Sequence, residues 1–164
     1  MWYACDSSKW IQPSWTKRSP RQASWAHSPT IRSRQIRTVQ PDSAAFSVVL
    51  NTDPEIDPGD HWIALVYKEP YFYFCDSYGR TIRDQTFPSA FSATVKSFIG
   101  KTAHKTNTKF LQQLTSNACG DYCVYFIEEL SKTSFTKITR VFSTDLKSND
   151  RFVTNYVKKL SIKV

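Results

Sequence analysis

The stretch "HWIALVYKEPYFYFCD", residues 61–76, contains two runs of aromatic and β-branched residues, and only residues 68–70 separate them. Such runs around a short polar break predict two antiparallel strands, 61–67 and 71–76, that form a hairpin. Both runs are apolar at nearly every position, which is typical of central strands covered by helices on both faces. We therefore expect this hairpin to be buried within the sheet of the domain.

The hairpin brings a histidine and an aspartate toward each other. If Lys68 and Glu69 form a two-residue loop, His61 falls directly opposite Asp76, whereas a three-residue loop places Asp76 opposite Trp62. Directly opposed Cβ atoms lie about 4.5–5.5 Å apart, which lets a carboxylate hold one imidazole tautomer. The register therefore predicts a His–Asp pair, which serves either catalysis or a purely structural contact.

The segments around the hairpin alternate between strand-like and helix-like patterns. We expect an α+β domain over residues 41–164, in which a small mixed sheet packs against helices. The expected strands are 45–51 and 108–114. Three helices are expected, at 88–100, at 150–160, and from a cap at Ser116 or Asn117 to about Lys132.

The first 40 residues carry most of the net charge of +8, since they hold seven basic residues against one acidic residue. This segment is also rich in Ser and Pro, contains four of the five Trp, and shows no strand or helix periodicity. We expect residues 1–40 to be poorly ordered. They either form a basic arm that binds DNA through phosphate contacts and stacking, or are a solvated or aberrant terminus.

The chain contains no apolar run of about 18 residues and no secretory signal, so we expect an intracellular protein without membrane contact. Four cysteines, Cys5, Cys75, Cys119 and Cys123, are then expected to be reduced. Cys75 and Cys123 are interpreted as buried structural thiols. No spacing typical of a zinc site occurs, and we assign no role to the remaining histidines, His27 and His104.

Cys119 lies in "SNACGDYC", residues 116–123, at the expected start of a helix. It is a nucleophile, half of a disulfide or a buried thiol. Unpaired amides and the helix dipole favour the anion there, so we expect a lowered thiol pKa, and an acid-oriented His beside it suits covalent acyl transfer. Gly120 leaves space for a substrate backbone, and a side-chain amide, Gln112 or Gln113, would complete an oxyanion hole.

The motifs "GDHWIAL", "FCDSYG" and "QQLTSNACGDYC" together resemble the adenovirus-protease-like (adenain-like) cysteine peptidases of the Ulp/SENP superfamily. The resemblance covers about residues 44–132. It implies a papain-like site on a circularly rearranged chain that hydrolyses peptide or isopeptide bonds, often after glycine-containing sequences. By this resemblance His61 is the base and acid, Asp76 orients it, Cys119 is the nucleophile, and Trp62 walls the substrate groove.

Within this superfamily the chain is more similar to the viral branch. Gln112, seven residues before the cysteine, matches the viral oxyanion position, whereas Gln113, six before, would match the Ulp branch. Ala118 stands where Ulp-type proteases have aspartate, and "FSVVLNTDPEIDPGDHW" resembles proteases of adenovirus-related viruses and Maverick/Polinton elements. The initial "MWYACD" also resembles their N-terminal segment, but the residues that follow, up to about residue 41, do not.

The resemblance implies a thiol endopeptidase that processes viral or virus-like precursor polypeptides. It implies a monomer in the virion or host nucleus that requires no cofactor, with DNA or a peptide as an activator. Two alternatives remain open. One is an isopeptidase of ubiquitin-like modifiers, and the other is a catalytically inert nucleic-acid-binding or structural protein that acts through residues 1–40.

Overall fold

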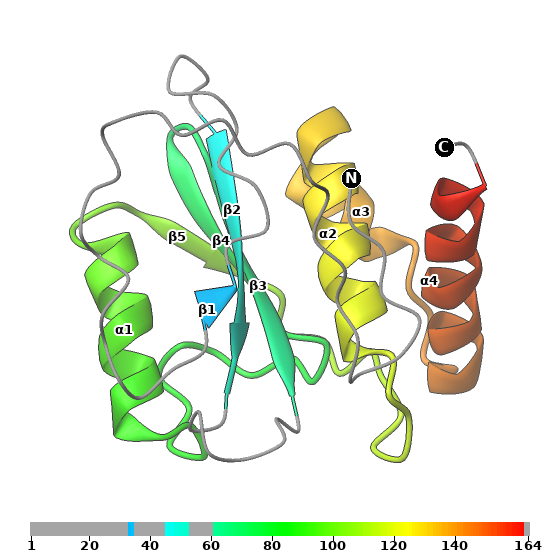
Figure 1. Ribbon diagram of the computed structural model, residues 1–164, viewed down its shortest axis with the longest axis horizontal. Coiled ribbons are helices and arrows are strands. Elements are labelled where there is room, and N and C mark those ends of the chain that lie inside the picture. Colours follow the sequence, from blue (N-terminus) through cyan, green and yellow to red (C-terminus); the bar gives the residue numbers. More distant parts are fainter. Residues whose placement is uncertain (1–32, 35–44, 53–60, 163–164) are drawn as a thin grey trace.

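The computed structural model describes residues 33–34, 45–52 and 61–162 of the chain. Its sheet has five strands in the order β1-β2-β3-β4-β5, of which β1 to β4 are antiparallel neighbours and β5 joins β4 in parallel (Figure 1). The mixed α+β fold predicted from the sequence is therefore confirmed. The strands are β1 (Ser33–Arg34), β2 (Ala45–Asn51), β3 (Trp62–Lys68), β4 (Tyr71–Cys75) and β5 (His104–Thr106).

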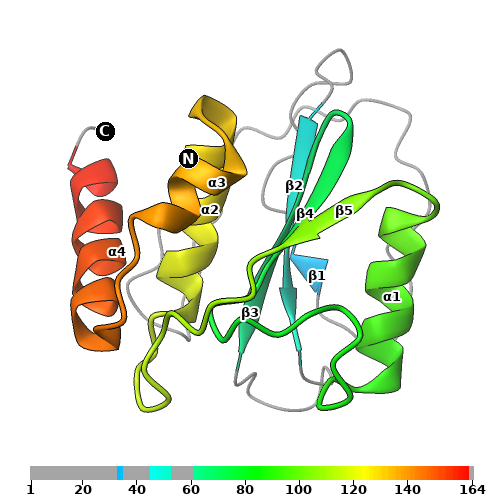
Figure 2. The ribbon, with the colours of Figure 1, turned by 180° about the vertical axis from the view of Figure 1, so that it is seen from behind.

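Helices cover both faces of this sheet. One face packs on α1 (Ser89–Ile99) and the other on α2 (Cys119–Lys132), as the views from front and back show (Figures 1 and 2). The long α4 (Leu146–Ser161) lies beyond α2, whereas the short α3 (Phe135–Arg140) also reaches the sheet, where Phe135 contacts Tyr73 of β4. Because β3 and β4 bury alternate side chains under α1 and α2, the hairpin is apolar at almost every position, as its sequence predicted.

The helix boundaries follow local sequence signals. The predicted helix at 88–100 is confirmed as α1, which begins after Pro88 and ends at Gly100, where φ is 56°. The last helix begins earlier than predicted because Asp145 caps it, accepting hydrogen bonds from the Lys147 and Ser148 amides. The helix α3, of six residues and capped by Ser134, was not predicted from the sequence.

The hairpin register differs from both predicted alternatives. Lys68 pairs with Tyr71, so the two-residue turn is Glu69 and Pro70. Continued past the strand ends, this pairing places His61 opposite Tyr78 and not opposite Asp76. The predicted direct opposition of His61 and Asp76 is wrong, although their side chains meet by another route, described below.

The strand predicted at 108–114 is also wrong, since the segment is a loop and the strand is β5 at His104–Thr106. The amides of Leu111 and Gln112 both donate to the carbonyl of Ser77 at 2.8 and 3.2 Å, so they are not available for a regular ladder. Of residues 1–40, the structure describes only Ser33–Arg34, which form β1. The prediction of a poorly ordered arm otherwise lies outside the described residues.

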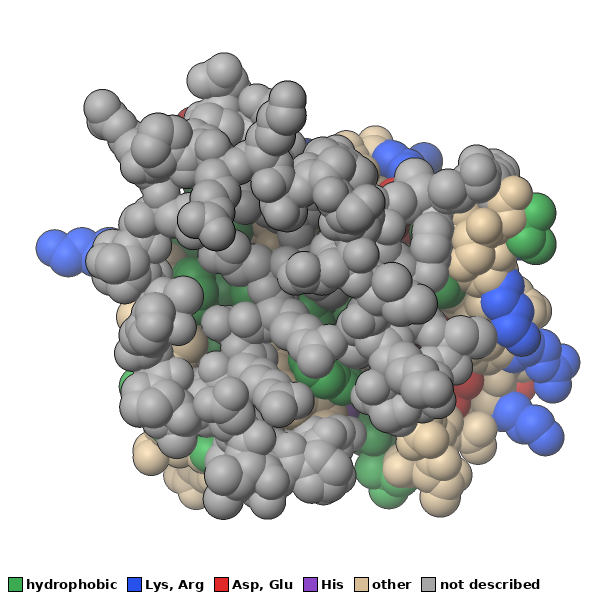
Figure 3. Space-filling model, viewed as in Figure 1, with side chains coloured by type: hydrophobic (Ala, Val, Ile, Leu, Met, Phe, Trp, Pro, Cys, Tyr) green, Lys and Arg blue, Asp and Glu red, His purple; other side chains and the backbone are tan. Residues whose placement is uncertain are grey.

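Basic side chains also lie on the surface of the described domain. Figure 3 shows Lys and Arg side chains along the margin that α4 occupies, and the exposed basic residues of this helix are Lys147, Arg151, Lys158 and Lys159.

No helix in the described part of the chain is both long and apolar enough to span a membrane.

Replacing a ring in the interface between α2 and the sheet should cost far more stability than replacing a ring at the surface. Phe126 is fully buried, whereas Phe152 on α4 is 42% exposed. We expect Phe126→Ala to lower the free energy of unfolding by about 3–5 kcal/mol, because it removes buried area and leaves a cavity. Urea unfolding of both variants tests this, and equal losses for Phe126→Ala and Phe152→Ala would contradict the assigned core.

Candidate active site

His61 and Asp76 form a buried hydrogen-bonded pair. His61 immediately precedes β3 and Asp76 immediately follows β4, so both lie at the same end of the hairpin. His61 Nε2 lies 2.6 Å from Asp76 Oδ1, and the two residues are 4% and 0% exposed. A carboxylate can only accept here, so Nε2 carries the proton that it donates. The structure thus brings the predicted pair together across a diagonal and not by direct opposition.

The turn after β4 holds the Asp76 carboxylate in place. The Tyr78 amide donates to Oδ1 at 2.9 Å, and Arg80 Nε donates to Oδ2 at 2.7 Å. The Gly79 amide closes the turn onto the Asp76 carbonyl at 2.8 Å. Gly79 has φ +70°, and a Cβ there would come within 2.6 Å of the Lys109 backbone, so only glycine fits this close approach.

Asn107 fixes the backbone of the same residue. Directly after β5, its Oδ1 accepts from the Asp76 amide at 2.9 Å, and its Nδ2 donates to the Asp76 carbonyl at 2.6 Å. This side-chain amide continues the β4–β5 pairing by one position. Sequence reasoning missed Asn107, which lies far from Asp76 in the chain and carries no local signal, and it also missed Arg80.

The partners of Asp76 keep its carboxylate ionised. Burial by itself would raise the pKa of Asp76, but the hydrogen bond and charge of His61, the charge of Arg80 and the Tyr78 amide outweigh it, and the pKa is lowered. Asp76 therefore remains a negative charge against the imidazole at neutral pH.

The other side of the imidazole has no hydrogen bond. Its ring stacks on Tyr78, with centroids 4.4 Å apart and planes 16° from parallel, and Tyr78 stacks in turn on Phe110. His61 Nδ1 is buried and has no hydrogen-bond partner among the described residues. Because Nε2–H points at Asp76, Nδ1 holds the free lone pair of the ring.

Cys119 is the first residue of α2 and is 8% exposed. Cys119 lies in the first turn as predicted, but the helix begins one or two residues later than expected, since Ala118 and not Ser116 or Asn117 occupies the cap position and no side chain caps the helix. The amides of Trp62, Gly120 and Cys119 itself lie near enough to the sulfur to favour its anion and so to lower its pKa. Trp62 follows His61 in the chain, so the sulfur lies beside the segment that carries the imidazole.

The predicted fall in the pKa of Cys119 is contradicted. Burial raises the pKa of this thiol above its ordinary value, and the three amides only partly offset it. Burial is the largest cause of the raised pKa of Tyr78, and a negative charge on Cys119 would raise it further. The resting cysteine is therefore a thiol, because desolvation exceeds the stabilisation that the helix start provides.

Gln112 and Gln113 have different surroundings. Gln112 is fully buried, its Oε1 accepts from Ser77 Oγ at 2.6 Å, and its Nε2 donates to the Ser116 carbonyl at 2.7 Å. Gln113 is half-buried, and its backbone amide donates to Asp150 at 3.3 Å. The structure thus fixes the orientation of the Gln112 amide, seven residues before the first residue of α2.

The other predicted residues occupy varied positions. Trp62 begins β3 and is half-buried against the core, and Gly120 lies in the first turn of α2. Cys75 and Cys123 are buried free thiols, as expected, and Cys119 is also free. Cys5 and His27 lie outside the described residues. No cluster of three metal-binding side chains occurs within residues 33–34, 45–52 and 61–162.

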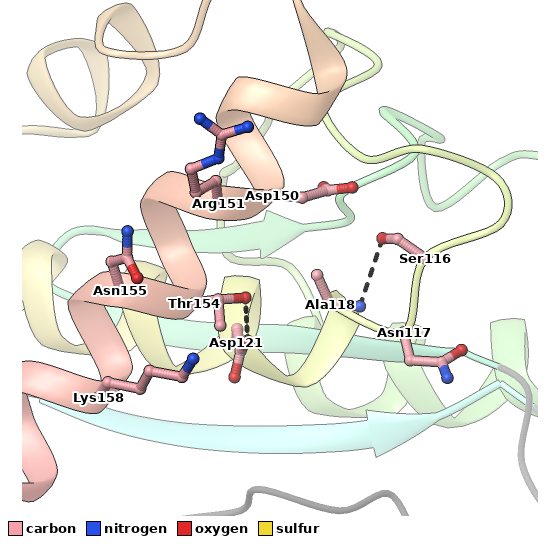
Figure 4. Close-up of a pocket in the computed structure, with 9 residues that line it drawn as sticks. All are labelled: Ser116, Asn117, Ala118, Asp121, Asp150, Arg151, Thr154, Asn155 and Lys158. Atoms are coloured by element: carbon pink, nitrogen blue, oxygen red, sulfur yellow. Dashed lines mark hydrogen bonds between the residues drawn. The ribbon is translucent and has the colours of Figure 1, made fainter.

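Two hollows flank the loop that leads into α2, and both are lined by Ser116 and Asn117. The first, of about 410 Å³, lies between this loop and α4, where Thr154 donates to Asp121 (Figure 4). The second, of about 500 Å³, borders His61, Tyr78 and Arg80. Neither is lined by Trp62 or Gly120, so the role of these two residues in a substrate groove stays a prediction.

No protein-family model matches the chain, and no curated protein is significantly similar to it. Among solved structures, the crystal structure of the ASFV pS273R protease is similar with a TM-score of 0.44 and 23% sequence identity. The match covers 68% of this chain and 43% of that protease, so the chain spans less than half of its length. We assign no residue of the site from this likeness.

Removing the Asp76 charge should destabilise the protein in a pH-dependent way. The pKa of Asp76 is lower in the folded protein, so its contribution is present above its unfolded pKa, about 3.9, and is lost as pH falls through the folded pKa. We expect Asp76→Asn to lower the free energy of unfolding at pH 7 by about 3–5 kcal/mol, because Arg80 loses its partner.

Chemical unfolding of wild type and variant from pH 7 to pH 2 measures this, and the difference should shrink below about pH 4. Asp84→Asn, in the following loop, is the control and should have the smaller effect, because Asp84 interacts there mainly with Thr86. A difference that stays constant down to pH 2 would contradict the lowered pKa.

Alkylation of Cys119 should require alkaline pH. Burial raises the pKa of Cys119 and also of Cys75 and Cys123, and the latter two are buried more deeply. We expect iodoacetamide to label Cys119 first of these three, at a rate that rises mainly above about pH 8.5, the ordinary thiol pKa. Mass spectrometry of peptides reports each site, with urea-unfolded protein as the control, and rapid labelling of Cys119 at pH 6 would refute this.

Proposed function

We propose that the protein is a cysteine peptidase in which Cys119 attacks the carbonyl carbon of a peptide bond. The main support is the geometry of His61, which donates from Nε2 to the ionised Asp76 and keeps Nδ1 bare and buried. The Trp62 amide, one residue further along the chain, lies near enough to the Cys119 sulfur to lower its pKa. A base oriented by an acid beside a thiol at a helix start is the arrangement that nucleophilic acyl transfer requires.

The chemistry proceeds by general-base catalysis. His61 Nδ1 takes the proton of the Cys119 thiol as sulfur bonds to the carbonyl carbon, and the carbonyl π electrons move to oxygen. The imidazolium then gives this proton to the leaving amine as the C–N bond breaks, which leaves an acyl-enzyme. Water, deprotonated by the same imidazole, releases the acid and the thiol. Asp76 stays ionised throughout and stabilises the imidazolium.

The raised pKa of Cys119 determines the starting state of this reaction. His61 Nδ1 has no hydrogen-bond partner among the described residues, Cys119 included, and burial raises the pKa of Cys119, so the starting state is a thiol beside a neutral imidazole. A change in the Cys119 side chain that brings sulfur to Nδ1 must precede proton transfer. The amides of Trp62, Gly120 and Cys119 then favour the thiolate once it forms.

Gln112 is the proposed donor to the developing oxyanion, together with the Cys119 amide. Because Ser77 occupies its Oε1, the amide nitrogen of Gln112 has a fixed direction. One of its hydrogens binds the Ser116 carbonyl, and the second remains for a ligand. A donor held in place before the reaction needs no reorganisation in the transition state.

The proposed substrate is a polypeptide, and the resemblance of the sequence to virus-type peptidases favours precursor proteins of a virus or virus-derived element. Action on conjugates of ubiquitin-like modifiers is the alternative substrate class. DNA contacts by residues 1–40, a monomeric state, and location in a virion or host nucleus belong to the same proposal.

Peptide turnover tests the function. We expect the purified protein to cleave glycine-containing peptides, and we expect Cys119→Ala to lose all activity and His61→Ala to fall by at least about 10²-fold, the usual contribution of a general base. Cys123→Ala, one turn further along α2, is the matched control and should keep turnover. A protein that still cleaves after Cys119→Ala is not a peptidase of this kind. Trapping by a ubiquitin-like modifier with a C-terminal electrophile would favour the isopeptidase.

Substitution of each of two neighbouring glutamines tests which of them donates to the oxyanion. Gln112→Ala should lower kcat by about 10²–10³-fold, the usual effect of removing one oxyanion donor, with a smaller change in KM. Gln113→Ala should leave kcat nearly unchanged, because its side chain is half-buried elsewhere on the loop. The reverse pattern would assign the oxyanion role to Gln113.

A further inference from the structure

The hollow beside His61 has no role in the reaction steps above. It measures about 500 Å³ and lies between the turn after β4, the loop before α1 and the loop before α2. It borders the imidazole but not the nucleophile. Its lining residues include His61, Tyr78, Arg80, Phe87 and Leu114.

The position of this hollow indicates which part of a polypeptide substrate it would bind. In the proposed reaction, to which this inference is tied, the imidazole passes its proton to the leaving amine. The leaving group must therefore lie on the imidazole side of the scissile bond. A hollow lined by His61 and not by Cys119 is placed to receive the residues that follow that bond.

Arg80 is the charged side chain that gives this hollow its chemistry. No Asp or Glu is among the described residues that line it, and Arg80 is the only Lys or Arg among them. Its Nε is bound to Asp76, but its Nη2 is buried and has no hydrogen-bond partner in the described part of the chain. A buried donor without a partner is unfavourable, and an acceptor in the hollow would relieve this.

Two aromatic rings lie close to the guanidinium. Its Cζ lies 4.3 Å from the centre of the Phe87 ring and 5.5 Å from that of Tyr78. Because Asp76 occupies Nε, the edge that carries Nη2 is the part of the guanidinium with a donor left for a ligand. This planar edge matches a carboxylate, which accepts two parallel hydrogen bonds from it.

We propose that the hollow beside His61 is the leaving-group subsite and that Arg80 makes it select an acidic side chain within the first two residues after the scissile bond. An acidic residue places its carboxylate against the free edge of Arg80, while the exposed Leu114 at the rim contacts the neighbouring apolar part of the peptide.

A peptide library that is random after the cleaved glycine, followed by matched peptides with Asp or Asn at the selected position, tests this directly. Asp and Asn have the same shape, so the ratio of their kcat/KM values reports the charge alone. We expect the Asp peptide to have at least about a tenfold higher kcat/KM, in line with one charge-assisted hydrogen bond. This ratio should fall as salt concentration rises.

Arg80→Gln should bring the ratio of Asp to Asn kcat/KM close to one. The ratio stays informative even if this variant is slow, because loss of the Asp76 contact affects both peptides equally. Arg83→Gln removes an equal charge from an exposed position three residues away and should keep the preference. Should Arg80→Gln not fold, the wild-type ratio and its salt dependence decide.

The outcomes separate the two proposals. Equal cleavage of the Asp and Asn peptides by the wild-type protein, or an unchanged preference in Arg80→Gln, would overturn the acidic subsite and leave the peptidase intact. Absence of any cleavage by wild-type protein, together with an unreactive Cys119 toward peptide electrophiles, would refute the peptidase and the subsite with it.

Discussion

The hydrogen bond between His61 Nε2 and Asp76 Oδ1 is the interaction on which the candidate site depends. It joins the start of β3 to the end of β4, and it determines which ring nitrogen of His61 is bare. Arg80 and the Tyr78 amide hydrogen-bond the Asp76 carboxylate, and Asn107 hydrogen-bonds the Asp76 backbone, so three neighbouring residues fix the position of Asp76. The sheet and α2 then bring the Cys119 sulfur to the amide next to His61.

The sequence predicts the elements of this fold where pattern and end signals agree. The strand at 45–51 and the helix from Pro88 to Gly100 are correct because β-branched runs and terminal Pro and Gly are local signals. The segment 108–114 was misassigned because Leu111 is buried by a loop that hydrogen-bonds Ser77, a tertiary contact with no local signature. Turn composition alone also could not fix the hairpin register.

In the candidate site, too, local features could be predicted from the sequence and tertiary features could not. The residues His61, Asp76 and Cys119 are recognisable from their types and spacing, but their electrostatics are not. A helix start predicts a lowered thiol pKa, yet burial of Cys119 exceeds that effect, and burial is a property of the whole fold. Arg80 has a weak signal, since it follows Asp76 by four residues across a turn sequence, whereas Asn107 has none.

The protonation of the His61 ring tests the central claim most directly. ¹⁵N NMR of the imidazole distinguishes a ring protonated at Nε2 from one protonated at Nδ1. At a pH where His61 is neutral, our account predicts a proton on Nε2, strongly deshielded by Asp76, and a bare Nδ1, with this pattern lost in Asp76→Asn. A proton on Nδ1, or a spectrum unchanged in Asp76→Asn, would contradict the account.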